Sequence, residues 1–277
     1  MPELPETETI ARDLDATLRG ATVLDLHAAH PDVLRGGSST EQAARLRGAS
    51  IVRVWRRAKL VVVELSHGAD GIDAVVAVQP RFTGALLLDA SSEADPYICV
   101  VWTLADGRTL AYRDVRRLGT VTLFSWSDWQ AYSAALGREP LDPTFAASDL
   151  SASIRTSSRA IKAVLMDQRI LAGVGNIYAT EALWAAGIDP SRSARSLSDA
   201  EGSALLEALR EILPRAIAAR GTSFRDYRDA HGGRGRFVEQ LTTYGRAGEP
   251  CRQCAARLIG TNAIDGRMTV FCARCQR

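Results

Sequence analysis

Two Cys-x2-Cys pairs constrain the fold of this chain more than any other feature of its sequence. One pair is Cys251 and Cys254, the other is Cys272 and Cys275, and 17 residues separate them. Each pair can form a thiolate knuckle, and two knuckles complete a tetrahedral site for one Zn²⁺ ion. Four thiolates leave no open coordination position, so the sequence predicts a single structural zinc. Two disulfides are the alternative, but disulfides are rare in the cytoplasm, where we expect this chain.

The cytoplasmic expectation comes from hydropathy and charge. No apolar run reaches the ~18 residues of a membrane span, and the first residues are acidic and amphipathic, unlike a secretory signal. With 277 residues, 46% of them hydrophobic, the chain is long enough for two domains. Residues 1–150 hold 15 basic and 20 acidic side chains, whereas residues 151–277 hold 19 and 12. The second half is therefore the better candidate for contact with a polyanion.

Hydrophobic periodicity predicts one helix followed by a β-rich region. A helix over 3–19 places Ile10, Leu14 and Leu18 on one stripe and stops at Gly20. Short apolar segments separated by turn residues then predict an antiparallel sandwich or barrel. These expected strands are 21–27, 50–56, 59–65, 72–79, 84–89, 97–104, 108–113 and 119–124.

The second half is predicted to be helical. A helix over 127–136 ends a first domain at 1–136, and the Pro, Gly and Asp residues of 137–148 indicate a linker. Further helices are expected in a domain at 149–250, followed by the zinc segment 251–277 and its short β-hairpin, which would project Arg267 from its second strand. The expected helices are 149–154, 158–167, 176–186 and 198–220, and the Gly- and Arg-rich residues 221–250 indicate a long functional loop.

A glycine-rich turn and a basic hairpin are candidate phosphate sites. In GVGN, two glycines let the backbone approach a ligand, and Asn176 opens the next helix, where N–H groups bind phosphate. Asn176 as an ordinary N-cap is the alternative. In WRRAK, Lys59 is one of only two lysines among 34 basic residues, and lysine can release its proton. A charged turn that protects a sheet edge fits WRRAK equally well.

Two loops combine cations with apolar side chains. QPRFTG (79–84) and DVRRLG (114–119) both lie at strand boundaries. Phe82, Arg116 and Leu118 can act as wedges of the kind that enter a base stack when a nucleotide is extruded. An aromatic residue packed in the core is the alternative.

The opening MPELPE has two interpretations. Prolines among glutamates suit the first turn of a helix. Alternatively, removal of Met1 would leave Pro2 with a free secondary amine.

Together these motifs resemble the formamidopyrimidine-DNA glycosylase and endonuclease VIII family of DNA repair enzymes. The resemblance spans the chain through MPELPE, RRAK, RRLG, DQ…GVGNIYATEAL, YGRAGEPC and CARCQ. It implies an α+β fold in which an N-terminal helix and an antiparallel β-sandwich precede a helix-two-turns-helix domain with a β-hairpin zinc finger.

The resemblance also implies a mechanism. Pro2 corresponds to the nucleophile that attacks C1′ of the damaged nucleotide, and Glu3 to the acid/base residue. Glu6 corresponds to a supporting carboxylate and Lys59 to a catalytic, phosphate-contacting lysine. An α-amine has a pKa near ~8, so an appreciable fraction is unprotonated at neutral pH.

The remaining residues that match the family are DNA contacts. Arg267 corresponds to a phosphate contact that also takes part in elimination. The other implied DNA contacts are Asn176, Tyr244, Arg159, Gln79, Phe82, Arg116 and Leu118, and the last three correspond to residues that fill the space of the everted nucleotide.

The chain departs from the family pattern around these wedges. Gln79–Phe82 replaces a His-x-Gly-Met sequence, and Leu118 replaces Phe. The loop 221–245 is similar in length to the lesion-capping loop of the purine-lesion branch, and this resemblance implies that Thr222, Arg225 and Tyr227 would lie near the everted base.

We therefore expect a monomeric cytoplasmic glycosylase/AP lyase that associates with the nucleoid when bound to DNA. Its substrate would be double-stranded DNA containing 8-oxoguanine, formamidopyrimidines or abasic sites, and no membrane would take part. The alternatives are an endonuclease VIII-type enzyme for oxidised pyrimidines and a catalytically silent DNA-binding protein.

Overall fold

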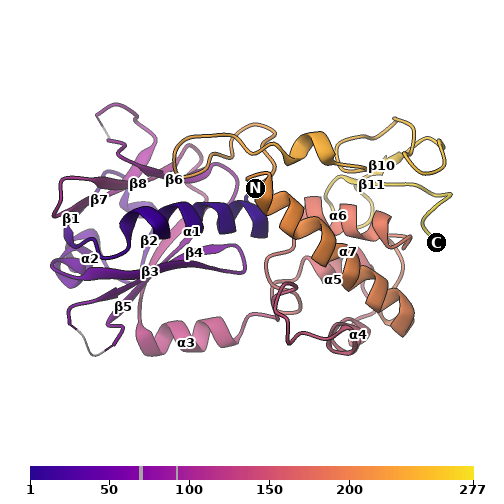
Figure 1. Cartoon of the computed structure of the whole chain (residues 1–277), viewed down its shortest axis with the longest axis horizontal. Coiled ribbons are helices and arrows are strands. Elements are labelled where there is room, and N and C mark those ends of the chain that lie inside the picture. Colours follow the sequence, from indigo (N-terminus) through magenta and orange to yellow (C-terminus); the bar gives the residue numbers. More distant parts are fainter. Residues whose placement is uncertain (69–70, 92) are drawn as a thin grey trace. The chain divides into compact units, whose positions relative to one another are not determined.

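The computed structural model describes residues 1–68, 71–91 and 93–277 (Figure 1). The chain divides into two compact units. The first comprises Met1–Ala134 and Ala219–Arg236, and the second comprises Ala135–Ala218 and Phe237–Arg277. Within the described part of the chain, no helix is long and apolar enough to cross a membrane.

The first unit begins with helix α1 (Leu4–Leu18). Pro5 lies in its first turn, where a missing N–H costs little, and the chain leaves the helix at Gly20 with φ +83°. The predicted stripe is buried, because Ile10, Leu14 and Leu18 are all fully inaccessible to solvent. The prediction of an N-terminal helix is thus confirmed.

Two β-sheets complete the first unit and confirm the predicted α+β class. One sheet has the order β2-β9-β5-β4-β3 and the other β1-β7-β8-β6. Their pairings are antiparallel apart from the short parallel pair β2–β9. The strands are β1 (Val23–Ala28), β2 (Leu34–Arg35), β3 (Ser50–Arg57), β4 (Leu60–Ser66), β5 (Ala74–Gln79), β6 (Gly84–Leu88), β7 (Ile98–Leu104), β8 (Thr109–Asp114) and β9 (Thr120–Ser125).

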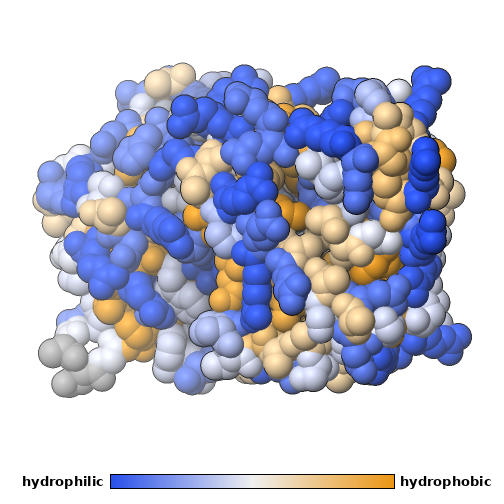
Figure 2. Space-filling view, turned by 45° about the vertical axis from the view of Figure 1, so that its right-hand side comes forward, coloured by the Kyte–Doolittle hydropathy of each residue, from blue (hydrophilic) through white to orange (hydrophobic). Residues whose placement is uncertain are grey.

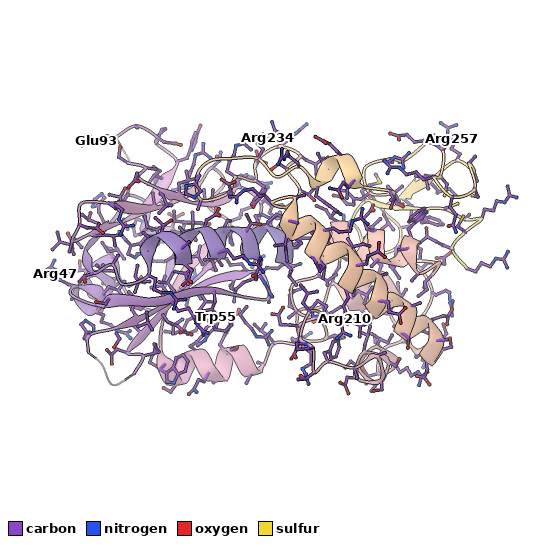
Figure 3. All side chains as sticks on the ribbon, viewed as in Figure 1. Arg47, Trp55, Glu93, Arg210, Arg234 and Arg257 are labelled. Atoms are coloured by element: carbon purple, nitrogen blue, oxygen red, sulfur yellow. The ribbon has the colours of Figure 1, made fainter. Side chains whose placement is uncertain are left out.

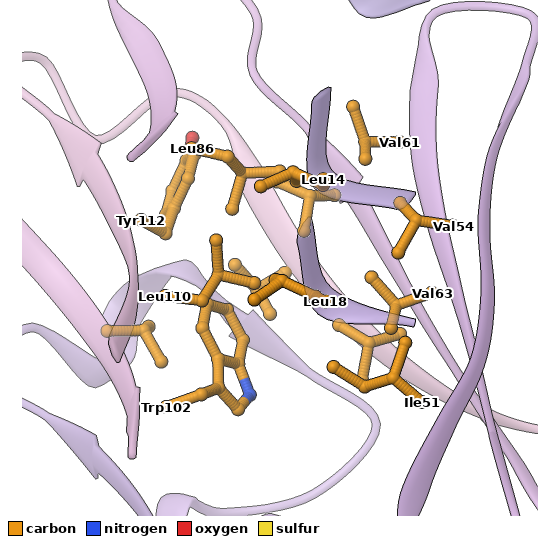
Figure 4. Packing of buried hydrophobic residues seen from close by; sticks show 14 of the residues in the cluster. Leu14, Leu18, Ile51, Val54, Val61, Val63, Leu86, Trp102, Leu110 and Tyr112 are labelled. Atoms are coloured by element: carbon orange, nitrogen blue, oxygen red, sulfur yellow. The ribbon is translucent and has the colours of Figure 1, made fainter. Parts of the chain in front are cut away.

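The core of this unit lies between the sheets and the helix. Figure 4 shows Leu14 and Leu18 of α1 among side chains from both sheets, such as Val63, Leu86 and Trp102. Each fully buried side chain of this size contributes about 1.5–3 kcal/mol to folding. Tyr112 of β8 lies beside Leu86, its partner on β6.

Three short elements of the first unit were not predicted from the sequence. A 3-10 turn (Pro31–Val33) leads into β2, and helix α2 (Ser39–Leu46) follows. Ser38 and Glu41 form a capping box at the start of α2, in which the Ser38 amide donates to Glu41 Oε2 at 2.7 Å. Helix α3 (Trp126–Ala134) ends the first of the two segments that make up this unit.

The second unit is helical with one small hairpin. Its helices are α4 (Ala147–Arg155), α5 (Ile161–Leu165), α6 (Asn176–Ala185) and α7 (Asp199–Ala218), with 3-10 turns at Ala194–Ser196 and Phe237–Gln240, and its strands are β10 (Ile259–Thr261) and β11 (Thr269–Phe271). Helix α5 is shorter than the predicted 158–167. Arg159 and Ala160 pair instead with the backbone of 193–194, which removes them from the helix.

Side chains also order the segment predicted as a linker. Arg210 of α7 (Figure 3) donates through Nε to the carbonyl of Pro140 at 3.1 Å and through Nη2 to that of Asp142 at 3.0 Å.

Figure 2 shows that hydrophilic side chains cover most of the visible face, with smaller hydrophobic areas between them.

Candidate functional site

Two buried carboxylates lie at the start of α1. Glu3 is 2% exposed and Glu6 is 1% exposed. The Glu3 amide donates to Glu6 Oε2 at 2.8 Å, and the Thr222 amide donates to Glu6 Oε1 at 2.7 Å. A buried carboxylate needs such donors, because an unsolvated charge is otherwise very unfavourable. Glu6 therefore joins the first residues of α1 to the segment 219–236.

The buried Lys59 lies toward the same end of α1. It is 7% exposed and forms, with Ala58 at φ +52°, a two-residue turn between β3 and β4. Three hydrogen bonds show that α1 and β3 run antiparallel. Gly20, just after α1, bonds to Ile51, Asp15 bonds to Val54, and Glu8 bonds to Arg56. This antiparallel order brings the 58–59 turn to the N-terminal end of the helix, where Pro2 and Glu3 lie.

The two arginines of WRRAK have structural contacts. Arg56 Nε donates to Glu8 Oε2 at 2.9 Å, and Arg57 Nε donates to Ser133 Oγ at 3.2 Å. Because β3 is an edge strand, these contacts agree with the interpretation as a charged edge. Lys59 differs from them in being buried within the turn.

Segment 219–236 is anchored to α1. Arg220 forms ion pairs with Asp13 and with Asp229, and the Tyr227 hydroxyl donates to the Glu6 carbonyl at 3.3 Å. Burial and the nearby Glu6 carboxylate raise the pKa of Tyr227, so it stays a neutral donor. Burial by itself would raise the pKa of Asp229, but hydrogen bonding from Arg220 outweighs burial and the pKa is lowered.

These contacts change the expectation for the loop 221–245. The structure divides this stretch, since Ala219–Arg236 belongs to the first unit and the residues from Phe237 belong to the second. Thr222 and Tyr227 are 4% and 5% exposed, and the Thr222 amide already binds Glu6. They anchor the loop, whereas Arg225 is exposed. Within the loop, Arg234 (Figure 3) reaches back to the Phe224 carbonyl.

The structure brings the predicted wedge residues together. Phe82 and Leu118 are 47% and 44% exposed. The Arg116 guanidinium lies over the Phe82 ring, 5.4 Å from its centroid. Gln79 ends β5, opposite Thr120 of β9.

In the second unit, Asn176 and Arg267 are held at neighbouring points. Asn176 is the first residue of α6, and Gly175 occupies the N-cap position, so Asn176 is not an ordinary N-cap. Its Nδ2 donates to the carbonyl of Met268 at 3.1 Å, while its buried Oδ1 accepts no hydrogen bond within the described chain. Met268 directly follows Arg267, so this bond ties the start of α6 to the hairpin.

Arg267 directly precedes Met268–Phe271, the segment expected as the second strand of the hairpin, and in the structure it lies just before β11 (Thr269–Phe271). Asp265 Oδ1 accepts the Arg267 amide at 3.0 Å, and Gly266 bonds back to Asn262 in the preceding turn. Asp265 Oδ2 also pairs with the fully buried Lys162 of α5 at 3.0 Å. Lys162 is the second of the two lysines in the sequence, and no sequence pattern predicts its pairing with Asp265.

The other predicted contacts of this unit differ in surroundings. Glu181 of α6, which sequence reasoning missed, accepts the amides of residues 242–244, and the bond to Tyr244 measures 2.7 Å. Tyr244 is half-buried and thus well positioned. Arg159 is exposed, and its Nη2 donates to Asp167 at 3.0 Å. A single glutamate within the apolar helix NIYATEALWA is the signal that could have identified Glu181.

The four cysteines converge as the motif predicts. Their sulfur atoms all lie within 4.8 Å of one another, with 3.5 Å between Cys254 and Cys272 and 4.0 Å between Cys251 and Cys275. All are free thiols, which argues against the disulfide alternative. A tetrahedral ion with Zn–S bonds of about 2.3 Å requires S···S separations of about 3.8 Å. The donor set therefore fits one four-coordinate Zn²⁺.

Comparisons with known proteins agree over both units. Residues 1–121 match the family model described as the formamidopyrimidine-DNA glycosylase N-terminal domain, and residues 136–228 match the model of the H2TH domain of the same enzymes. A formamidopyrimidine-DNA glycosylase of Desulfitobacterium hafniense is 39% identical over 279 residues, which covers 100% of both chains.

Solved structures give the same result. A variant of the Lactococcus lactis Fpg protein in complex with Fapy-dG-containing DNA is 31% identical, with a TM-score of 0.90 over 100% of each chain. The Lactococcus lactis Fpg complex with abasic-site DNA is 31% identical, with a TM-score of 0.89 over 99% of each chain.

Proposed function

The chain belongs to the formamidopyrimidine-DNA glycosylase family, and we propose that it excises oxidised purines from double-stranded DNA and then cleaves the resulting abasic site as a lyase. The observation that carries this proposal is the arrangement at the start of α1. Glu3 and Glu6 are buried beside Pro2, and Lys59 lies toward the same end of the helix.

Pro2 is the proposed nucleophile once Met1 has been removed. Its secondary amine attacks C1′ of the damaged nucleotide, the bond from C1′ to the base breaks, and the base leaves with the bonding electron pair and takes up a proton. Loss of the ring oxygen from C1′ gives an iminium between Pro2 and the opened sugar. The iminium withdraws electrons, so the C2′ proton is acidic and the 3′ and then the 5′ phosphate are eliminated.

Glu3 and Glu6 have separate proposed roles. Glu3 protonates the sugar ring oxygen as the ring opens, because a carboxylic acid within reach is the suitable donor. Glu6 holds the Glu3 amide and the Thr222 amide, so it fixes the first residues of α1 against segment 219–236. Lys59 supplies a buried cation next to the phosphate backbone.

The second unit is proposed to hold the DNA backbone. Asn176 and Arg267 lie at neighbouring points of α6 and the hairpin, where an amide and a guanidinium can bind successive phosphates. One Zn²⁺ held by the four cysteines would give this hairpin a rigid base, and its role would be structural.

Borohydride trapping tests the proposal. Protein whose intact mass shows loss of Met1 is mixed with a duplex containing 8-oxoguanine opposite cytosine or an abasic site, and the iminium is reduced to a covalent adduct. We expect an adduct with the processed chain and none with protein that retains Met1, which serves as the matched control. Absence of an adduct with the processed chain on both duplexes would favour the catalytically silent alternative.

Relative rates test the substrate class. We expect faster excision of 8-oxoguanine than of thymine glycol in the same sequence context. The reverse order would indicate the endonuclease VIII-type alternative and would refute the purine assignment while leaving the lyase chemistry intact.

A further inference from the structure

A buried aspartate joins the two loops that carry the exposed wedge residues. Asp114, at the end of β8, is 1% exposed. Its Oδ1 accepts from the Thr83 hydroxyl and from the Arg116 amide, and its Oδ2 accepts from the Tyr112 hydroxyl at 3.1 Å and from the Gly119 amide at 2.8 Å. One carboxylate thus binds two side-chain and two backbone donors.

The donors come from both loops. Thr83 belongs to the loop between β5 and β6, and its hydroxyl oxygen also accepts the Arg116 amide at 3.1 Å. Arg116 and Gly119 belong to the loop between β8 and β9. Thr83 and Asp114 therefore bind the two loops to each other as well as to the sheet.

Each loop carries a strained residue next to a wedge side chain. Arg81 (φ +55°) precedes Phe82, and Arg117 (φ +50°) lies between Arg116 and Leu118. A left-handed backbone is unfavourable for a residue other than glycine and persists only when its surroundings enforce it. The bonds to Asp114 on either side of Arg117 provide such enforcement.

Two glycines at the ends of these loops leave no room for a side chain. A Cβ on Gly119 would lie 1.9 Å from the Tyr112 hydroxyl, and a Cβ on Gly84 would lie 2.3 Å from the Pro80 carbonyl oxygen. Burying a carboxyl group costs desolvation that its hydrogen bonds largely offset, so this network gains little for stability alone. What the carboxylate fixes is the course of the two loops.

We infer that Asp114 is a positioning residue that holds Phe82, Arg116 and Leu118 as one preformed wedge and thereby sets the enzyme's discrimination between bases opposite the lesion. The inference rests on the proposed function. With the loops fixed, Arg116 stays over the Phe82 ring, and its guanidinium meets the orphaned base in one geometry. With the loops released, the wedge still fills the gap, but it contacts different opposite bases more equally.

The test compares Thr83→Val with Thr83→Ser. Valine has nearly the shape of threonine but lacks the hydroxyl that bonds to Asp114 and to the Arg116 amide, whereas serine keeps it. The first measurement is the ratio of kcat/KM for 8-oxoguanine opposite cytosine to that opposite adenine. The second is the fluorescence of 2-aminopurine placed opposite an abasic-site analogue, which reports how the opposite base is unstacked.

For Thr83→Val we expect the ratio to fall by about three- to tenfold, the effect of one lost buried hydrogen bond, and the 2-aminopurine signal to change. Thr83→Ser should retain both. The borohydride trapping rate on preformed abasic sites should stay within about twofold of the wild-type rate, since the Pro2 chemistry is untouched. Val63→Ala, a core change in β4, controls for lost stability and should leave the ratio unchanged.

The outcomes separate the two proposals. If the wild-type chain gives no trapped adduct, the proposed function fails. If it is trapped but Thr83→Val matches Thr83→Ser in ratio and fluorescence, the role of Asp114 is refuted and the function stands. Should Thr83→Val not fold, Tyr112→Phe removes one hydroxyl from the same carboxylate, and an unchanged ratio in that variant would equally overturn the inference.

Discussion

Glu6 in the first unit and Asp265 in the second both hold a chain segment by accepting a backbone N–H, but on very different supports. Glu6 is part of a unit whose core contains α1 and both sheets. Asp265 lies at the tip of a hairpin whose buried cluster, among the residues that the structure describes, is small: Cys251, Leu258, Val270 and Cys272, with partly buried side chains such as Trp184 packed against it. The comparison teaches that a carboxylate accepting backbone amides is supported by apolar burial in the first unit, and by a buried ion pair beside a cluster of four cysteines that could hold a metal ion in the second.

Of the changes considered, zinc removal should affect the second unit most strongly while sparing the first. After chelation we expect residues 251–277 to unfold. In small zinc domains the free energy of zinc binding, about 10–16 kcal/mol, supplies the free energy of folding, and chelation removes it. Affinity for a duplex with an abasic-site analogue should fall at least about tenfold, since the hairpin carries Arg267 and a charged hydrogen bond contributes about 1.5–3 kcal/mol. Fluorescence anisotropy with parallel metal analysis measures both.

The first unit supplies the control for this experiment. Its sheets hold none of the cysteine ligands, so the main thermal transition should persist in the chelated protein. Re-addition of Zn²⁺ should restore the affinity. Unchanged affinity after confirmed metal loss would contradict the support that we assign to the metal.

Lys162→Met should destabilise the second unit by about 3–5 kcal/mol. The lysine is fully buried, and its loss would leave the Asp265 carboxylate without its cation. The double variant Lys162→Met/Asp265→Asn should recover much of this loss, because no lone charge remains while an oxygen still accepts the Arg267 amide. Urea unfolding measures both, and a double variant no more stable than the single one would argue against the ion pair.

Glu6→Gln and Glu181→Gln test the same kind of contact, a buried glutamate that accepts backbone amides, once in each unit. Each glutamate accepts at least two backbone amides, and a glutamine would turn an N–H toward one of them. We expect each change to lower the free energy of unfolding by about 1–3 kcal/mol. Glu6→Gln should slow borohydride trapping, whereas Glu181→Gln should mainly weaken DNA affinity. The same kinetic effect from both variants would show that the units are not functionally distinct.

Asn176→Ala and Arg267→Ala should weaken binding by about 1–3 kcal/mol and to a similar extent for every lesion. Contacts to phosphate position the DNA without reading its sequence. For Arg267→Ala the slope of log affinity against log salt concentration should become shallower by about one. A strongly lesion-selective effect of either change would require contact with the base itself.

Acid pH should reveal the smallest effect. Hydrogen bonding from Arg192, with burial opposing it, lowers the pKa of Glu201 in the second unit from 4.5 to about 2. A depressed folded-state pKa contributes stability above the unfolded value and loses it as pH falls from about 4.5 toward 2. Because the pair is partly exposed, we expect at most about 1 kcal/mol. Glu201→Gln should flatten the stability curve in this window, and an unchanged curve would refute the assignment.

Local patterns predicted most of the framework. The strands of the sandwich, the buried stripe of α1 and the convergence of the four cysteines follow from alternation, helical spacing and ligand spacing, which operate within short windows. Helix α5 was predicted too long because the pairing of 159–160 with 193–194 is a long-range contact that a helical window does not contain.

The acceptors that organise the site were harder to foresee. Asp114 and Asp265 lie in charged, turn-like sequence, where an aspartate is usually exposed. Only the fold shows that both side chains are buried, Asp114 against two amides and two hydroxyls and Asp265 against one amide and Lys162. Their donors lie in distant or irregular segments that have no periodicity. The same reason hid the division of the loop 221–245 between the two units.

The two-residue turn at Ala58–Lys59 limits which changes in chain length the first unit can tolerate. Neighbouring strand residues face opposite sides of a sheet, and β3 and β4 pair without interruption from Arg53 and Glu64 to Arg57 and Leu60. Inserting or deleting one residue would either turn Lys59 to the opposite face or force a bulge into the edge strand. Sequence drift in this hairpin should therefore proceed by substitution, and the distance in sequence from Arg57 to Leu60 should serve as a reliable landmark when such chains are aligned.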